Sequence, residues 1–86
     1  MKIAFTDAAW EDYLWFQQNQ PQLLKRINEL IKDAKRHPFN GIGKPEPLKR
    51  DLRGSWSRRI TDEHRLVYRI EQDILLVISC RYHYES

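Results

Sequence analysis

The chain contains one cysteine, Cys80, among its 86 residues. A lone thiol excludes an intrachain disulfide and a multi-cysteine zinc site. Histidine is also scarce. His37, His64 and His83 are scattered without the spacing of metal ligands, and no carboxylate cluster is suited to magnesium. We therefore expect a protein of the reducing cytoplasm that works without a metal or another cofactor.

Long apolar runs are missing from the sequence. The apolar stretch within Met1–Asp7 is too short for a signal peptide, and no segment is long enough to span a membrane, so we expect no membrane partner. Glycine is scarce as well, and Gly41-Ile42-Gly43 lacks the strand-to-helix setting of a phosphate-binding loop. The 41% of hydrophobic residues is enough for one small domain, which we expect to span residues 1–86.

The net charge is mildly positive, with 15 Lys and Arg against 12 Asp and Glu. The basic residues gather in the second half of the chain: Lys44, Lys49, Arg50, Arg53, Arg58, Arg59, Arg65 and Arg69. Spread over the surface, they would serve solubility, whereas on one face of a sheet they would attract a polyanion. Their position in the fold therefore matters more than their number.

The order of predicted elements is β-α-α-β-β-β, which indicates an α+β fold. A short strand at residues 1–5 precedes a helix that Thr6 or Asp7 caps and that ends near Asn19. A second, clearly amphipathic helix covers residues 21–37. Residues 38–48 are rich in proline and glycine and are predicted to form a loop. Strands are predicted at residues 55–60, 64–70 and 74–82.

The faces of these elements follow from periodicity. In the first helix, Ala9, Trp10, Tyr13, Leu14 and Gln17 are expected to face the core, which leaves Trp15 and Phe16 outside it. Since side chains alternate along a strand, the even positions 56–82 are expected to pack beneath the helices. Arg58 does not fit and is expected near a sheet edge. The opposite face would then carry Arg59, Arg65, Arg69, Arg81 and His83, together with Ser57 and Ser79.

Glu46 and His83 are the candidates for proton transfer. Glu46 lies between Pro45 and Pro47, which stiffen the backbone, so it is either an ordinary exposed carboxylate or one held in place to take a proton. His83 is either a surface residue near the chain end or a general acid, since imidazole titrates near neutral pH. Tyr84 can stack on a base or simply close the end of the sheet.

The basic residues Lys49, Arg59 and Arg65 have two readings as well. They can form weak surface ion pairs with Asp62 and Glu63, or they can converge on a phosphate. Metal-free cleavage of RNA needs a base for the 2′-OH proton, cations for the five-coordinate phosphorus, and an acid for the departing 5′ oxygen. These residues would supply all three functions.

The same segments resemble the YoeB toxins of the RelE/ParE superfamily, ribosome-dependent mRNA interferases of type II toxin–antitoxin pairs. The matching blocks cover most of the chain in order: Lys25–Asp33 (KRINELIKD), Gly43–Lys49 (GKPEPLK), Gly54–Ile60 (GSWSRRI), Glu63–Tyr68 (EHRLVY) and Cys80–Tyr84 (CRYHY). The resemblance implies two N-terminal helices on one face of a mostly antiparallel, twisted sheet. It also implies that the opposite face enters the ribosomal A site.

The resemblance further implies a role for each candidate residue. Glu46 would be the base and His83 the acid, with Arg65 also catalytic. Lys49, Arg59 and Tyr84 would contact the RNA and its phosphate. The resemblance also implies a homodimer and a cognate antitoxin that wraps the toxin, for which Trp15 and Phe16 are candidate contacts. In this sequence Glu85 and Ser86 follow the terminal His-Tyr pair of the family.

Two alternatives to an RNA-cleaving enzyme stay open. Relatives of the ParE type share the architecture but act as protein-binding modules on DNA gyrase, without cutting RNA. A toxin of this shape can also block the ribosome without catalysis. New 5′ ends in mRNA would separate the enzyme from both alternatives.

Overall fold

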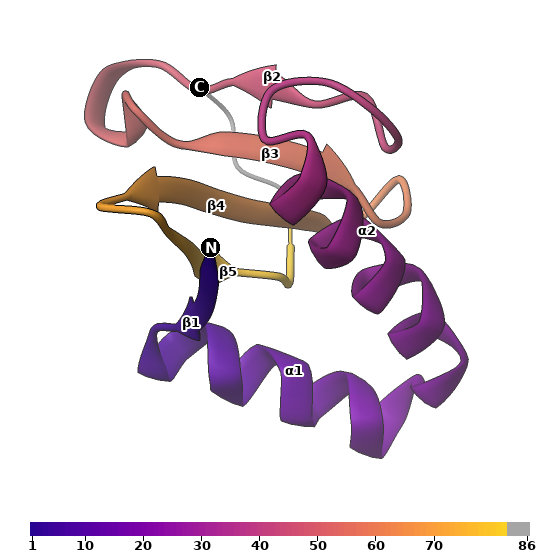
Figure 1. Cartoon of the computed structure of the whole chain (residues 1–86). Coiled ribbons are helices and arrows are strands. Elements are labelled where there is room, and N and C mark those ends of the chain that lie inside the picture. The colour runs from indigo at the N-terminus through magenta and orange to yellow at the C-terminus, as the bar shows by residue number, and fades with distance from the viewer. Residues whose placement is uncertain (83–86) are drawn as a thin grey trace.

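The computed structural model describes residues 1–82 and confirms the α+β architecture (Figure 1). Its elements follow one another along the chain as β1 (Lys2–Phe5), α1 (Asp7–Asn19), the 3₁₀ turn η1 (Pro21–Leu23), α2 (Leu24–Arg36), β2 (Glu46–Pro47), the 3₁₀ turn η2 (Arg50–Leu52), β3 (Trp56–Arg59), β4 (Arg65–Glu71) and β5 (Ile74–Ser79). Neither α1 nor α2 is long and apolar enough to cross a membrane, which holds for every helix in residues 1–82.

The sheet has the strand order β1-β5-β4-β3-β2, and its helices pack on one face (Figure 1). β1 runs parallel to β5, and all other neighbours are antiparallel. β5 therefore has a neighbour on each side, as expected for a strand rich in aliphatic residues. The two-residue β2 lies in the segment predicted to be loop. It is an edge strand, a position that tolerates Pro47 because proline cannot donate a ladder hydrogen bond.

The first helix begins where the sequence predicts. Thr6 is the N-cap, since its Oγ1 accepts a hydrogen bond of 3.0 Å from the amide of Ala9 and donates one of 2.8 Å to the carbonyl of Ile78. The predicted core stripe is wrong in part: Phe16 is fully buried, whereas Trp10 is 48% exposed. The buried side of α1 follows Ala9, the partly buried Tyr13 and Phe16, an i, i+4, i+7 pattern rotated from the one expected.

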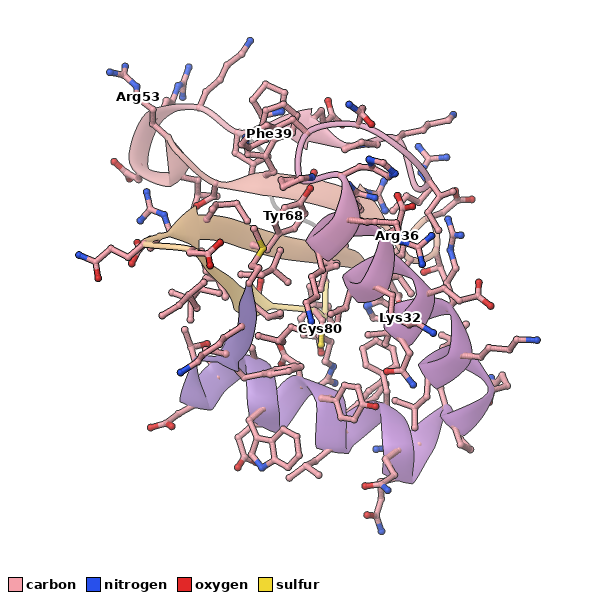
Figure 2. The ribbon with its side chains drawn as sticks, viewed as in Figure 1. Lys32, Arg36, Phe39, Arg53, Tyr68 and Cys80 are labelled. Atoms are coloured by element: carbon pink, nitrogen blue, oxygen red, sulfur yellow. The ribbon has the colours of Figure 1, made fainter. Side chains whose placement is uncertain are left out.

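The second helix buries the stripe that its periodicity predicts: Ile27, Leu30, Ile31 and Ala34. Pro21 lies in the 3₁₀ turn η1 rather than in the first turn of the α-helix, which starts at Leu24. Figure 2 shows Lys32 and Arg36 along α2, away from this buried stripe, and Tyr68 and Cys80 in the interior. Burial raises the pKa of the Cys80 thiol to about 12, so the thiol is unreactive at neutral pH.

The predicted alternation of faces holds from β3 to β4 and fails in β5. Trp56 pairs with Tyr68, but Tyr68 pairs with Val77, so the core residues of β5 are Leu75 and Val77 at odd positions. The cause is the two-residue turn of Gln72 and Asp73, both at positive φ, which pairs Glu71 with Ile74 and reverses the parity. The register shifts again between Val67 and Tyr68, and Val67 pairs with Ser79.

The last predicted strand also ends earlier than expected, at Ser79 instead of Tyr82. The amide of Cys80 donates to Asp12 Oδ2 of α1 at 3.0 Å, so it is lost to the sheet. Arg81 lies 3.7 Å above the ring of Trp15 on α1, and not on the face with the other arginines as predicted. Tyr82, expected in the core, is 56% exposed.

Candidate functional site

Glu46 stands at the end of a row that crosses the sheet. It pairs with Ser57 of β3, Ser57 pairs with Val67 of β4, and Val67 pairs with Ser79 of β5. Paired residues of neighbouring strands point to the same side of a sheet. This row therefore lies on the face opposite to Tyr68 and the helices. Glu46 itself is exposed at the β2 edge, between its two prolines.

Arg59 and Arg65 form the next row on the same face. They are direct cross-strand partners, two residues along β3 and β4 from Ser57 and Val67. Two residues of a strand span roughly 7 Å, so the carboxylate row and the arginine row are neighbours. The structure therefore brings Glu46, Arg59 and Arg65 to one face, as the sequence predicts.

The two arginines are held differently, although like charges opposite each other repel. Arg65 is turned over the β3–β4 connection, where its Nη1 donates to the carbonyls of Thr61, Asp62 and His64. Arg59 is 44% exposed, and its Nη1 lies 3.6 Å from a carboxylate oxygen of the fully exposed Asp62. A pair as exposed as this contributes little to stability, so Arg59 can exchange Asp62 for a phosphate.

Lys49 and Arg69 lie apart from the Arg59–Arg65 pair, Lys49 just before η2 and Arg69 further along β4. Lys49 is exposed, three residues after Glu46, and its carbonyl accepts a hydrogen bond of 3.1 Å from Leu52. Arg69 pairs with Leu76, on the predicted face, and its Nη2 donates to the carbonyl of Arg53 at 3.1 Å. A side chain at position 54 would collide with this guanidinium, which is consistent with glycine there at a φ of +94°.

The prediction that Arg58 lies near a sheet edge is wrong. Far from being at a sheet edge, it is fully buried on the helix side of β3. Its Nη1 lies 2.6 Å from Asp33 Oδ2, and its Nε donates to Tyr68 Oη at 3.0 Å. The guanidinium also donates to three carbonyls, those of His37, Asn40 and Ile42. We call Arg58, Asp33 and Tyr68 the buried hub.

The hub sets the acidity of its own members. The hydrogen bond from Arg58, followed by that from the Ile42 amide, holds the pKa of Asp33 below its ordinary value. Burial raises the pKa of Tyr68, whose hydroxyl donates to the carbonyl of Pro38 at 2.6 Å. The Arg58–Asp33 ion pair is thus kept charged, and the phenol neutral, across the neutral pH range.

The hub also fixes the segment that leads to Glu46. Four carbonyls within residues 37–42 accept hydrogen bonds from Arg58 or Tyr68, and the amide of Ile42 donates to Asp33 at 3.0 Å. The carbonyl of Gly43 then accepts a hydrogen bond of 2.7 Å from the amide of Arg59. At Gly43, with a φ of +80°, an added Cβ would lie 2.6 Å from Leu30, so the chain approaches α2 closely here. The route from α2 to Glu46 is therefore tied to β3.

Tyr82, the last described residue, is hydrogen-bonded to His64 and Arg65 at the start of β4. The amide of Tyr82 donates to His64 Nδ1 at 2.9 Å, and its carbonyl accepts from the amide of Arg65 at 3.0 Å. His64 is buried edge-on against Phe16, with ring centroids 5.0 Å apart. The predicted site residues His83 and Tyr84 lie outside the described residues 1–82.

The expectation that Trp15 and Phe16 lie outside the core, as candidate antitoxin contacts, is wrong. Phe16 is fully buried, and Trp15 packs on the core and beneath Arg81. The exposed aromatic surface of α1 is instead Trp10, which stacks on Tyr13 with centroids 5.8 Å apart. The interval of seven residues between Ala9 and Phe16 was the signal that would have identified the buried side.

Solved structures share this fold along their whole length. The YoeB/ParE toxin from Agrobacterium tumefaciens has a TM-score of 0.94 at 52% identity, covering 98% of this chain and 100% of that one. A YoeB dimer from Staphylococcus aureus has a TM-score of 0.90 at 49% identity, and 98% of each chain is covered. The same toxin is known in a heterotetrameric complex with the antitoxin YefM, with a TM-score of 0.88, 49% identity and 98% of each chain covered.

Sequence comparison gives the same result. A toxin YoeB from Synechocystis sp. is 68% identical over 85 residues, which make up 99% of this chain and 99% of the relative. The family described as "YoeB-like toxin of bacterial type II toxin-antitoxin system" matches residues 5–84. The chain therefore belongs to the YoeB-like toxins of bacterial type II toxin–antitoxin systems.

Proposed function

We propose that the chain is a toxin endoribonuclease that cleaves mRNA in the ribosomal A site and thereby inhibits translation. The observation that carries the proposal is the presence of Glu46 and the Arg59–Arg65 pair in adjacent rows of one sheet face. A base beside two cations is the arrangement that attack of a ribose 2′-OH on its own phosphate requires. Since DNA lacks this hydroxyl, the reaction is selective for RNA.

In the proposed reaction, Glu46 takes the proton of the 2′-OH as its oxygen attacks phosphorus. The bond between phosphorus and the 5′ oxygen then breaks, which leaves a 2′,3′-cyclic phosphate on one fragment. A general base needs a fixed position within reach of its proton. The flanking prolines and the pairing with Ser57 give Glu46 such a position.

Arg65, Arg59 and Lys49 are proposed to stabilise the negative charge that builds up on the phosphate oxygens. Arg65 is oriented in advance, because three carbonyls hold its Nη1. Donors that need no rearrangement during the reaction are the most effective. Arg59 and Lys49 are exposed and suited to binding the RNA backbone on both sides of the cleaved bond.

His83 is proposed to be the acid that protonates the departing 5′ oxygen, and Tyr84 a residue that positions the RNA. His83 directly follows Tyr82, whose carbonyl accepts from Arg65. His83 is therefore joined directly to a residue that is hydrogen-bonded to Arg65. This short tether supports the assignment.

The proposed partners are a cognate antitoxin, mRNA on the ribosome, and a second copy of the chain, all in the cytoplasm. An antitoxin that covers the basic face would block access to RNA. For the second copy we propose an apolar hollow of about 630 Å³, which is lined mainly by Ile3, Phe5, Trp10, Tyr13 and Ile31. The Staphylococcus aureus relatives, solved as a dimer and with YefM, support both protein partners.

The test is a brief induction of the wild-type chain and of Glu46→Gln, followed by mapping of mRNA 5′ ends by primer extension. We expect new 5′ ends within codons for the wild type, and a rate lowered about 10²- to 10⁴-fold for Glu46→Gln. The matched control is Glu29→Gln, at an exposed carboxylate on α2, which should cleave at the wild-type rate. Growth arrest without new ends would instead favour gyrase binding or ribosome blocking. Full activity of Glu46→Gln would refute the assignment of the base.

A further inference from the structure

The three residues after β5 contact two elements, α1 and the start of β4. The amide of Cys80 donates to Asp12 of α1, and the guanidinium of Arg81 stacks on Trp15. Tyr82 then turns toward β4 through a left-handed φ of +67°, which is uncommon for a residue other than glycine. A backbone in this conformation persists when its surroundings hold it there.

The hold on Tyr82 comes from its backbone rather than from its ring. The ring is largely exposed, so burial does not fix the residue. The amide instead donates to His64 Nδ1 at 2.9 Å, and the carbonyl accepts from the Arg65 amide at 3.0 Å. His64 and Arg65, two consecutive residues, therefore hold both backbone polar groups of one residue. The Arg65 bond is between backbones, whereas the His64 bond depends on a side chain.

His64 is itself rigid. Its amide donates to Thr61 Oγ1 at 3.1 Å, and its carbonyl accepts from the amide of Ile60 at 3.0 Å. Its ring is wedged against Phe16 and Trp15 of α1. Because Nδ1 accepts the hydrogen bond from the Tyr82 amide, the proton of the neutral ring is assigned to Nε2. Glu63 Oε1 lies 3.0 Å from Nε2, although the geometry is not that of a hydrogen bond. The Nδ1 lone pair is thus directed at Tyr82.

We propose that His64 is a positioning residue, which anchors Tyr82, the residue that directly precedes the proposed acid His83. The proposal rests on the proposed function, and His64 acts through Tyr82 without touching RNA. The mechanism needs the acid on one side of the phosphate and Glu46 on the other. Loss of the anchor would leave the RNA contacts intact but misplace the acid. The step from bound to cleaved RNA would then slow, with little change in binding.

The experiment compares two amide substitutions of similar polarity. In His64→Asn, the Oδ1 atom can occupy the place of Nδ1 and accept from Tyr82. In His64→Gln, the oxygen reaches the place of Nε2 and leaves Tyr82 without its acceptor. A third variant, His64→Phe, keeps the aromatic contact with Phe16 and removes the acceptor. Each variant cleaves mRNA on programmed bacterial ribosomes, so that kcat and KM are obtained separately.

We expect His64→Gln and His64→Phe to lower kcat by about 10²-fold, since a displaced catalytic group costs about that much, with KM within a few-fold of wild type. His64→Asn should keep kcat within about tenfold. Equal losses in the Asn and Gln variants would overturn the proposal, as would an unchanged kcat in either His64→Gln or His64→Phe.

Nuclear magnetic resonance makes the test independent of catalysis and of any variant that fails to fold. In the wild-type chain, imidazole ¹⁵N shifts should place the His64 proton on Nε2, and the Tyr82 amide should exchange slowly with solvent. The slow exchange should persist in His64→Asn and vanish in His64→Gln. A wild type that does not cleave mRNA but keeps this protection would refute the proposed function and leave the anchor intact. A rapidly exchanging Tyr82 amide in the wild type would refute the anchor.

Discussion

The two chain segments that reach the candidate site are held in contrasting ways. The segment leading to Glu46 is fixed by the buried hub, in which the fully buried Arg58 binds a carboxylate, a phenol and three backbone carbonyls. The segment after β5 is held by single contacts to Asp12, Trp15, His64 and Arg65. The first belongs to the core of the fold, whereas the second passes from the buried Cys80 to the exposed Tyr82.

This difference separates stability from function. A buried charge whose partners are removed is costly, because it cannot regain its hydration. Changes in the hub should therefore unfold the protein before they alter its chemistry. Changes at Arg81 or Tyr82 remove one contact at a time from residues that are partly or largely exposed, so the fold should survive them. The proposed base is thus positioned by the fold as a whole, whereas Tyr82, which precedes the proposed acid in the sequence, is held by a few local contacts.

The largest expected effect is on stability, in Arg58→Leu. The substitution leaves three carbonyls without the Arg58 donor, and it leaves the partly buried Asp33 carboxylate with the Ile42 amide but no cation. We expect the free energy of unfolding to fall by about 3–5 kcal/mol. Urea unfolding followed by circular dichroism measures this change.

The matched control for Arg58→Leu is Arg36→Leu. Arg36 is the last residue of α2 and is exposed (Figure 2). Its removal should therefore change the free energy of unfolding by less than about 0.5 kcal/mol. Equal stabilities of the two variants would mean that the hub adds nothing to the fold, and the contrast between the two segments would disappear.

The second largest effect is a dependence of stability on acid. Because the hydrogen bond from Arg58 holds the pKa of Asp33 below its ordinary value of 3.8, the ionised carboxylate stabilises the folded state. This stabilisation is fully present above pH 4 and is lost as the pH falls through the lowered pKa. Asp33→Asn should be less stable at neutral pH and show a shallower loss between pH 4 and pH 2. Parallel pH profiles of the two proteins in urea unfolding would contradict this account.

Sequence alone predicted the elements well, but it predicted their faces less reliably. The stripe of α2 is strongly periodic, and β3 and β4 keep the same parity, so Arg59 and Arg65 were correctly placed on one face. The parity of β5 depends on the length of one turn. A two-residue turn reverses it, and the pattern of hydrophobic residues in a strand apolar on both faces does not reveal this.

Contacts between residues that are far apart in the sequence could not be predicted from the sequence alone. Arg58 has the parity of a core residue, but its partner Asp33 lies 25 positions away on a helix. A buried arginine is plausible only once such a partner is known, so the residue was assigned to an edge. The end of β5 was likewise decided by Asp12, which takes the Cys80 amide from 68 positions away. The roles proposed for the site residues depend on residue type and order, whereas contacts depend on the fold.

The smallest expected effect is in the terminal segment, in Arg81→Gln. The guanidinium lies 3.7 Å above Trp15 and 4.6 Å above the ring of Tyr82, a cation–π geometry worth about 0.5–2 kcal/mol. We expect a loss of stability in this range, well below that of Arg58→Leu. The intensity of Trp15 fluorescence should change as well, because the guanidinium no longer covers the indole ring. Arg81→Lys should recover part of the loss, since an ammonium group also binds an aromatic face. A loss as large as that of Arg58→Leu would show that the terminal segment is part of the core, because a contact at the surface cannot carry so much of the folding energy.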